Sequence, residues 1–287
     1  MSSTDSKFVF FDGDVIQASS VPVDFRSRAF RYGDSLFESI RVAHSRALLL
    51  DKHLNRLMLS LPLLKLEPVI SVSHPDIGRY IDKLLRANRI FGGCRLRMTV
   101  FREGSGFYLP GSNRAHVLIE SFQMESPEYN TNPKALKVDV YSDIKKPVNA
   151  LSGIKSGNAL IYIMAAIWCR ENNLDDCIIL NESGNVCEAT SSNIFIFRKD
   201  ALLTPSLEEG CVAGVMREAV IEKASESGIT VYDDTYITGN ELLNAEEIFF
   251  TNAIKGIQPV LAYKNKRYYS KFSKILVNLL NQDMVKG

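Results

Sequence analysis

The stretch that most constrains the fold is 153–197, in which a helix is followed by two strands. After Lys155, apolar residues recur at helical spacing and predict a helix that ends near Asn172; they are Leu160, Ile161, Met164, Ala165 and Trp168. The segment CIILN then predicts a buried strand, ESGN a turn, and VCEATSSNIFIF a second strand that carries Glu188. A lysine at a helix entrance and a carboxylate beside small hydroxyl residues indicate a cofactor site, although most such charges in proteins are solvated.

Composition excludes several classes of protein. The 287 residues, 46% of them hydrophobic, are enough for two domains with real cores. Lys plus Arg, 34, nearly equals Asp plus Glu, 33, so charge gives no reason to expect nucleic acid or an anionic membrane as partner. No apolar run approaches the roughly 20 residues that span a bilayer, and the start, MSSTDSKFVFFDG, lacks the pattern of a secretory signal. Five cysteines without a CxxC pair predict reduced, buried thiols in a cytoplasmic protein and no metal site.

The first half of the chain predicts an antiparallel sheet with helices. Residues 7–18 form a hairpin signal at Asp12-Gly13. Further strands are expected at 36–42, 46–50, 94–102 and 115–122. On the strand 94–102, Arg95 and Arg97 share one face, where two guanidinium groups either bind a carboxylate or remain solvated.

Two helices are expected between these strands. Asp51 is the predicted cap of the first, whose apolar stripe consists of Leu54, Leu57, Met58 and Leu61. His53 and Arg56 lie off this stripe. Ser73 is the predicted cap of the second helix, which buries Ile77, Ile81, Leu84 and Leu85.

A polar segment with two prolines, 123–134, is the predicted linker between domains at 1–122 and 135–287. In the second domain, Gly210 and Gly214 flank a loop that leads into a helix from about 215, and a helix N-terminus can hold a phosphate. Thr238 and Glu241 form a capping-box pattern. The last helix, about 269–284, is expected to bury Phe272, Ile275, Leu276 and Leu279.

Six motifs in a fixed order resemble the class IV aminotransferases, the pyridoxal-phosphate enzymes of fold type IV. They are YGDSLFESIR at 32–41, HLNRL at 53–57, IKSGNALIY around Lys155, NESGNVCEATSSNIFIF at 181–197, TPSLEEGCVAGVMRE at 204–218 and EIFFTNAIKGIQPV at 247–260. The resemblance covers roughly residues 8–262. It implies an α/β fold of two domains, a small N-terminal antiparallel sheet with helices and a larger barrel-like C-terminal domain, with the site in the cleft between them. It also implies a homodimer whose partner closes the pocket.

The resemblance implies a role for each matched residue. Lys155 is expected to bind pyridoxal 5'-phosphate covalently and to move the α-proton of the substrate. Glu188 is expected to face the pyridine nitrogen, and Arg56 to bind the phosphate. The other expected cofactor contacts are the backbone of Val215 and Met216, Asn252 with the backbone of Ala253, and the small polar run Thr190, Ser191 and Ser192 beside the ring. The expected substrate contacts are Tyr32 and Phe37 as pocket walls, and Arg97 with, second, Arg41 as ligands of the carboxylate.

Departures from the family pattern bear on the substrate, a small amino or oxo acid. The segment after strand 94–102 lacks the Arg-x-His pair of D-amino acid aminotransferases, which counts against that activity. Leu160 stands where branched-chain aminotransferases have tyrosine, and Gly106-Phe107-Tyr108 stands where lyases often have Arg-Gly-Tyr. The prediction is a branched-chain-like aminotransferase acting between an L-amino acid and a 2-oxo acid. The alternative is a 4-amino-4-deoxychorismate lyase that makes 4-aminobenzoate and pyruvate. A catalytically silent member of the fold is disfavoured by the joint presence of Lys155, Glu188 and Arg56.

Overall fold

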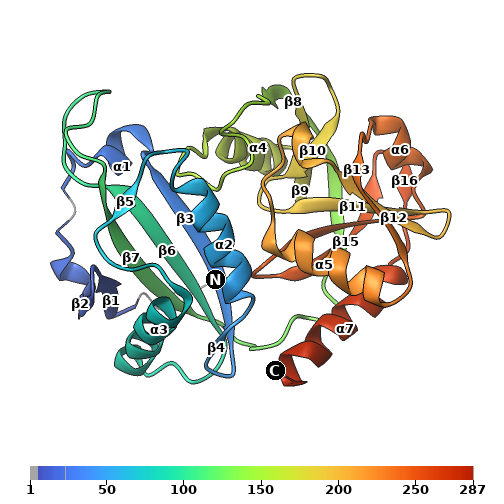
Figure 1. Cartoon of the computed structure of the whole chain (residues 1–287). Coiled ribbons are helices and arrows are strands. Elements are labelled where there is room, and N and C mark those ends of the chain that lie inside the picture. The colour runs from blue at the N-terminus through green and yellow to red at the C-terminus, as the bar shows by residue number, and fades with distance from the viewer. Residues whose placement is uncertain (1–5, 23, 287) are drawn as a thin grey trace. The chain divides into compact units, whose positions relative to one another are not determined.

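The computed structural model describes residues 6–22 and 24–286; residues 1–5 of the expected non-signal N-terminus lie outside it. The chain divides into two compact units (Figure 1). Unit 1 comprises Met1–Glu128 and Ile154–Ala159, and unit 2 comprises Tyr129–Gly153 and Leu160–Gly287. Lys155 therefore belongs to unit 1, although the chain on both sides of 154–159 belongs to unit 2. The domain limits expected at 122 and 135 stay predictions.

Unit 1 is built on a seven-stranded sheet with the order β2-β1-β7-β6-β3-β4, and β5 pairs with β7. The strands are β1 Phe8–Phe11, β2 Asp14–Gln17, β3 Ser35–Ala43, β4 Arg46–Ala47, β5 Glu67–Pro68, β6 Cys94–Arg102 and β7 Arg114–Gln123. The hairpin at Asp12-Gly13 and the long antiparallel strands are confirmed. The strand expected to run from Arg46 to Leu50 is wrong beyond Ala47, because Leu50 already begins a helix.

The described residues of unit 1 form three α-helices, α1 Arg28–Tyr32, α2 Leu50–Ser60 and α3 His74–Asn88, with a short 3-10 turn at Ala18–Ser20. Ser73 caps α3, and its four predicted apolar residues are buried, so this helix is confirmed. In α2 the expected cap is wrong, since Leu49 is the N-cap. The expected stripe is wrong at Met58, which is 52% exposed, and at His53, which is fully buried. His53 lies on the buried face because a buried carboxylate of β3 bonds its ring.

Unit 2 is built on a nine-stranded sheet with the order β10-β9-β8-β15-β14-β11-β12-β13, and β16 pairs with β15. The strands are β8 Leu136–Lys146, β9 Asp176–Asn181, β10 Val186–Ala189, β11 Asn193–Arg198, β12 Ala201–Pro205, β13 Thr230–Thr235, β14 Glu247–Asn252, β15 Gly256–Tyr263 and β16 Lys266–Arg267. The sheet curls into a half-barrel around a core that includes Ile178, Ile194, Ile248 and Phe250. The single strand expected over 186–197 is wrong: β10 pairs with β9, and β11 pairs with β12 and β14. The break at 190–192 is a bend in which Thr190 bonds Asp176 instead of continuing the ladder.

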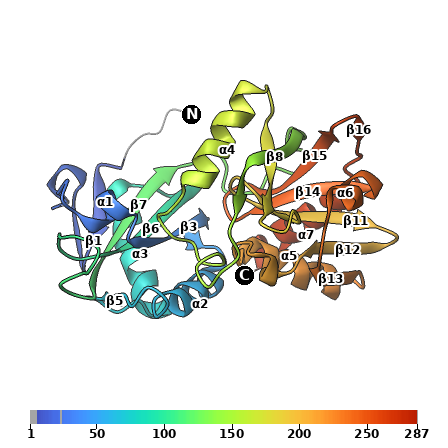
Figure 2. The same ribbon diagram turned by 90° about the horizontal axis from the view of Figure 1, so that it is seen from above.

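In the part of unit 2 that the structure describes there are four α-helices, α4 Leu160–Glu171, α5 Val215–Glu226, α6 Gly239–Asn244 and α7 Phe272–Lys286, with a 3-10 turn at Leu207–Glu209. Figure 2 shows α4 beside β8, against which it packs together with β9. Its inner face is rotated from the expected one, because Ala165 and Cys169 fill the contact while Leu160 is 69% exposed. The capping box of α6 is confirmed. In α7 the expected burial is wrong at Ile275, which is exposed.

None of the described helices is long and apolar enough to cross a membrane.

Candidate active site

Lys155 lies in an extended segment at the edge of β3, not at the start of a helix. The amide of Phe37 donates to the Lys155 carbonyl at 2.9 Å, and the amide of Gly157 donates to the Ser35 carbonyl at 2.9 Å. These bonds make a short antiparallel bridge, and α4 begins only at Leu160. Glycine is needed at 157 because a Cβ there would collide with the hydroxyl of Ser35. The backbone of Lys155 is thus fixed by the strand that carries Phe37.

Two cationic side chains lie close to the ring of Phe37. The Lys155 Nζ atom lies 4.5 Å from the ring centroid, and the guanidinium carbon of Arg97 lies 3.9 Å from it. Arg97 is on β6, opposite Ser39. Burial lowers the pKa of Arg97, whereas the negative charge of Glu120 acts to raise it. A partly desolvated guanidinium beside an amine and an aromatic ring can bind a carboxylate more strongly than a surface arginine can.

Arg41 and Tyr32, the other expected substrate residues, have local partners. The guanidinium of Arg41 is buried and donates to the carbonyls of residues 126, 127 and 128 at 2.6–3.1 Å. The Tyr32 hydroxyl donates to the Gly106 carbonyl at 3.2 Å. Their substrate roles stay predictions, and the carbonyl contacts of Arg41 do not favour one.

A buried carboxylate, Glu38, holds Arg56 and His53 together inside unit 1. The Arg56 Nε atom lies 2.9 Å from Glu38 Oε1, Arg56 Nη2 bonds Oε2, and His53 Nδ1 lies 2.7 Å from Oε2. Burial alone would raise the pKa of Glu38, but the charge of Arg56 and the hydrogen bonds from His53 and Arg56 lower it to about 2. Burial lowers the pKa of His53, although Glu38 opposes this effect. Glu38 therefore fixes the orientation of Arg56, the expected phosphate ligand.

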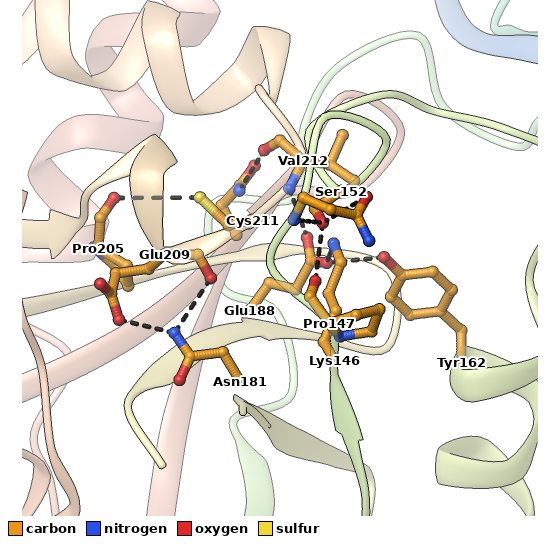
Figure 3. A network of polar contacts seen from close by, with 12 residues as sticks. Lys146, Pro147, Ser152, Tyr162, Asn181, Glu188, Pro205, Glu209, Cys211 and Val212 are labelled. Carbon is orange, nitrogen blue, oxygen red and sulfur yellow. Dashed lines mark hydrogen bonds and ion pairs between the residues drawn. The ribbon is translucent and has the colours of Figure 1, made fainter. Parts of the chain in front are cut away.

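Glu188 is the centre of a polar network in unit 2 (Figure 3). It is buried on β10, and its Oε1 atom bonds the ammonium of Lys146 and accepts from the Tyr162 hydroxyl at 2.7 Å. Its Oε2 atom accepts from the amide of Val212 at 3.0 Å. A carboxylate oxygen has two acceptor positions, so one position on Oε2 takes no hydrogen bond from the described residues. Burial, followed by the charge of Glu188, raises the pKa of Tyr162, which stays a hydroxyl donor.

The small polar run after Glu188 forms the bend between β10 and β11. The Thr190 hydroxyl donates to Asp176 Oδ1 at 2.6 Å, and Ser192 Oγ accepts from Asn252 Nδ2 at 3.0 Å. Ser191 is exposed. At the end of β14, the carbonyl of Ala253 accepts from the Tyr129 hydroxyl at 3.1 Å. Ser192 and Asn252 therefore lie side by side, and their roles toward the cofactor stay predictions.

The N-cap residue of α5 is a glycine, which has no side chain to cap the helix. Its N-cap is Gly214, followed by Val215 and Met216, and the first amides of a helix have no partner within it. A Cβ at 214 would collide with Asn193 Oδ1, so only glycine leaves this approach to the helix open. Such a terminus suits a phosphate. The Thr251 hydroxyl, on β14, is buried without a partner among the described residues.

Comparisons with known proteins decide the family. The pattern of the family "Amino-transferase class IV" matches residues 35–263. The chain belongs to this family. It is 26% identical over 255 residues to a D-alanine aminotransferase of Bacillus licheniformis, covering 88% of this chain and 87% of that protein. It is 27% identical over 268 residues to an aminodeoxychorismate lyase of Bacillus subtilis, covering 92% and 89%. Among solved structures, a branched-chain aminotransferase from Thermoproteus uzoniensis with norvaline matches with a TM-score of 0.85 at 25% identity, covering 98% of this chain and 95% of that one.

As a member of the class IV aminotransferases, the protein is an enzyme that uses pyridoxal 5'-phosphate. The side chains of each unit fit this cofactor. Unit 2 offers a buried anion with a remaining acceptor position, an uncapped helix N-terminus and a buried hydroxyl without a described partner. Unit 1 offers the amine of Lys155 and the guanidinium of Arg56.

Sequence reasoning missed four residues of these networks: Glu38, His53, Lys146 and Tyr162. Glu38 and His53 stand inside the motifs that carry the resemblance, so their positions were a signal. Lys146 had none, because a lysine at the end of a strand is ordinarily solvated. Tyr162 lies two residues after Leu160, so the absence of tyrosine at 160 did not reveal that a nearby tyrosine hydroxyl bonds Glu188.

Proposed function

We propose that the protein is an aminotransferase that moves an amino group between an L-amino acid with an apolar side chain and a 2-oxo acid. The observation that carries this proposal is the group formed by Lys155, Phe37 and Arg97. It offers an amine for proton transfer, an aromatic surface for an apolar side chain and a guanidinium for a carboxylate. The absence of the Arg-x-His pair after strand β6 supports an L- rather than a D-amino acid.

In this proposal each matched residue has its own role toward the cofactor. Lys155 is the attachment point and moves the α-proton of the substrate through its Nζ atom. Arg56, oriented by Glu38, holds the phosphate together with the amides of Val215 and Met216. Asn252 and the backbone of Ala253 complete the phosphate contacts.

The remaining proposed contacts are with the ring and the substrate. The proposed ring contacts are Glu188 at the pyridine nitrogen and the run Thr190, Ser191 and Ser192 beside it. When bound, the cofactor supplies the electron sink for the charge left on the substrate carbon. Glu188 keeps a negative group beside the ring, and the Lys146 ammonium compensates the charge of the buried carboxylate. Tyr32, Phe37, Arg97 and, less favoured by its contacts, Arg41 are the proposed substrate residues.

The Lys155→Ala variant tests the attachment point. The purified wild-type protein is expected to show the visible absorbance of a covalently held cofactor, and the variant to lose both this absorbance and nearly all turnover. The matched control is Lys145→Ala, which removes an exposed ammonium bonded to the Glu182 carbonyl at 3.2 Å. A borohydride-reducible adduct that persists in Lys155→Ala would refute the assignment.

A second candidate activity, that of a 4-amino-4-deoxychorismate lyase, is favoured by Leu160 and by the similarity to the Bacillus subtilis lyase. The two activities differ in their need for an amino acceptor. Release of pyruvate from aminodeoxychorismate without an added oxo acid would establish the lyase. Turnover of L-amino acids only when a 2-oxo acid is present would establish the aminotransferase.

The proposal includes a cytoplasmic homodimer. Support for the dimer comes from large apolar side chains of unit 1 that are exposed in the single chain: Phe25, Phe30, Phe107, Tyr108 and Leu109. Arg28 bonds the carbonyls of Phe107 and Tyr108, so two of these segments are held against each other. Exposed apolar surface of this kind is typical of a protein interface. Light scattering of the purified enzyme would measure its oligomeric state.

A further inference from the structure

Two cysteines and an aspartate meet where α4 turns back into β9, in unit 2. Cys169 lies near the end of α4, and Asp176 and Cys177 begin β9. The chain reverses between them through Asn173, whose φ is 53°, and the amide of Leu174 donates to the Cys169 carbonyl at 2.9 Å. This reversal brings the three side chains together although their sequence spacing is not that of a familiar metal motif.

The potential ligand atoms of these residues are already close. The two sulfur atoms and a carboxylate oxygen all lie within 4.8 Å of one another. In a tetrahedral zinc site, with Zn–S near 2.3 Å and Zn–O near 2.1 Å, ligand atoms are about 3.4–3.8 Å apart. Side-chain rotations that move these atoms by about 1 Å would therefore bring them to the spacing of ligands on one zinc ion.

The carboxylate of Asp176 has one oxygen in use and one available. Its Oδ1 atom accepts from the amide of Cys177 at 2.8 Å, from the amide of Thr190 at 3.3 Å and from the Thr190 hydroxyl at 2.6 Å. Among the described residues, no hydrogen bond reaches Oδ2, and no basic side chain forms an ion pair with this carboxylate. Asp176 is only 9% exposed. The charge of Lys255 acts on this carboxylate only from beyond ion-pair distance, whereas buried charges in proteins are normally paired or bind metals.

A cavity adjoins the cluster. It has a volume of about 300 Å³, and its walls include Ala166, Cys169, Arg170, Leu174, Asp176 and Thr190. Water holds about 30 Å³ in the liquid, so the cavity has room for a water ligand and for the entry of an ion. Cys177 is fully buried.

We infer that Cys169, Asp176 and Cys177 bind a thiophilic divalent cation of the Zn²⁺ class. Both sulfur atoms bind as thiolates, so each thiol releases its proton to solvent as its bond to the metal forms, and Asp176 binds through Oδ2. A water molecule from the cavity is the fourth ligand. The ion links α4 to β9 and, through Asp176 and Thr190, fixes the bend at 190–192. This inference does not depend on the proposed substrate.

The experiment is metal binding to the purified holoenzyme after dialysis against a chelator. Titration with Zn²⁺ is expected to saturate at one ion per chain, with release of protons. Titration with Co²⁺ is expected to give thiolate-to-cobalt absorption. Loss of a partner that only orients a metal ligand lowers affinity about 10–100-fold, so Cys169→Ser, Cys177→Ser and Asp176→Asn should each weaken Zn²⁺ binding at least about tenfold.

Cys94→Ser and Cys187→Ser are the matched controls, since both cysteines are buried elsewhere in the chain. They should bind Zn²⁺ as the wild type does. If a variant of the cluster fails to fold, alkylation of wild-type Cys169 with and without Zn²⁺ gives the answer, because a bound ion should protect this thiol. No stoichiometric binding, equal loss in the controls, a cobalt spectrum without thiolate absorption, or unchanged alkylation would each overturn the inference.

Discussion

Replacing Glu38 by glutamine removes the charge that holds Arg56 and His53 inside unit 1. Glu38 is buried, and its two oxygens bond both partners. Its pKa is lowered from 4.5 to about 2, a difference that corresponds to about 3 kcal/mol of stability in the ionised state. The Glu38→Gln variant should therefore lose about 3 kcal/mol of unfolding free energy at pH 7, in line with the cost of breaking a buried pair.

The pH dependence separates this electrostatic effect from a loss of packing. Because the folded-state pKa of Glu38 is depressed, its contribution is fully present above pH 4.5 and disappears as the pH falls towards 2. The difference between wild type and Glu38→Gln should shrink from about 3 kcal/mol at pH 7 to about 1.5 kcal/mol at pH 3. Other carboxylates titrate equally in both proteins and cancel in this difference.

Hydrogen exchange of the α2 amides in the holoenzyme, at several pH values, measures the stability of this part of unit 1. The control is Glu103→Gln, which removes an exposed ion pair with Arg114 at 3.1 Å and should cost less than about 1 kcal/mol. A difference for Glu38→Gln that stays constant from pH 7 to pH 3 would mean that the carboxylate stabilises unit 1 by shape rather than by charge.

Three further substitutions probe the other groups. Lys146→Met leaves Glu188 without its cation and should lower unit 2 stability by about 3–5 kcal/mol, measured by urea unfolding followed through Trp168 fluorescence; an unchanged midpoint would contradict the pairing. Gly214→Ala should weaken cofactor affinity, measured by titrating the cofactor-free enzyme, because the new Cβ collides with Asn193. Gly111→Ala is the control for glycine loss, since no atom lies near its Cβ and its φ is not positive. Arg97→Ala should raise KM for substrates with a carboxylate by about tenfold or more, from a charge-assisted bond of about 1.5–3 kcal/mol, and leave cofactor absorbance intact; equal losses for amines without a carboxylate would make Arg97 structural.

Helices and strands could be predicted from the sequence where apolar residues recur at a regular spacing and a capping or turn residue marks the end of the element. The helix α3 has both, since Ser73 caps it and its apolar residues recur every three or four positions. In helix α4 apolar residues recur at helical spacing, but few polar residues mark its outer face, so the sequence did not show which face packs inward. Packing against β8 and β9 selects Ala165 and Cys169 because small side chains let the helix lie close to the sheet.

Residues of the candidate site could be predicted where they stand in a family motif. Contacts between residues that are far apart in the sequence could not be predicted. The expected strand over 186–197 failed at the bend 190–192, because the bonds of Thr190 to Asp176 replace a ladder between residues that are far apart in sequence. Lys155 was expected at a helix entrance, yet it lies in a short bridge to β3 that no local pattern encodes. The pairing of Lys146 with Glu188 spans a strand, a loop, a helix and two further strands.

Both units bury a carboxylate with a cation, although this is a poor way to stabilise a fold. A buried ion pair contributes little net stability compared with well-packed apolar residues of the same volume. Glu38 with Arg56 in unit 1 and Glu188 with Lys146 in unit 2 are nevertheless buried and bonded on both carboxylate oxygens. Each carboxylate also lies within two residues of a group proposed to contact cofactor or substrate, since Phe37 precedes Glu38 and the bend 190–192 begins two residues after Glu188. Stability therefore does not explain why these two positions are charged. Their proposed functions do, because Glu38 fixes the direction of the Arg56 guanidinium and Glu188 presents an anion with one remaining acceptor position.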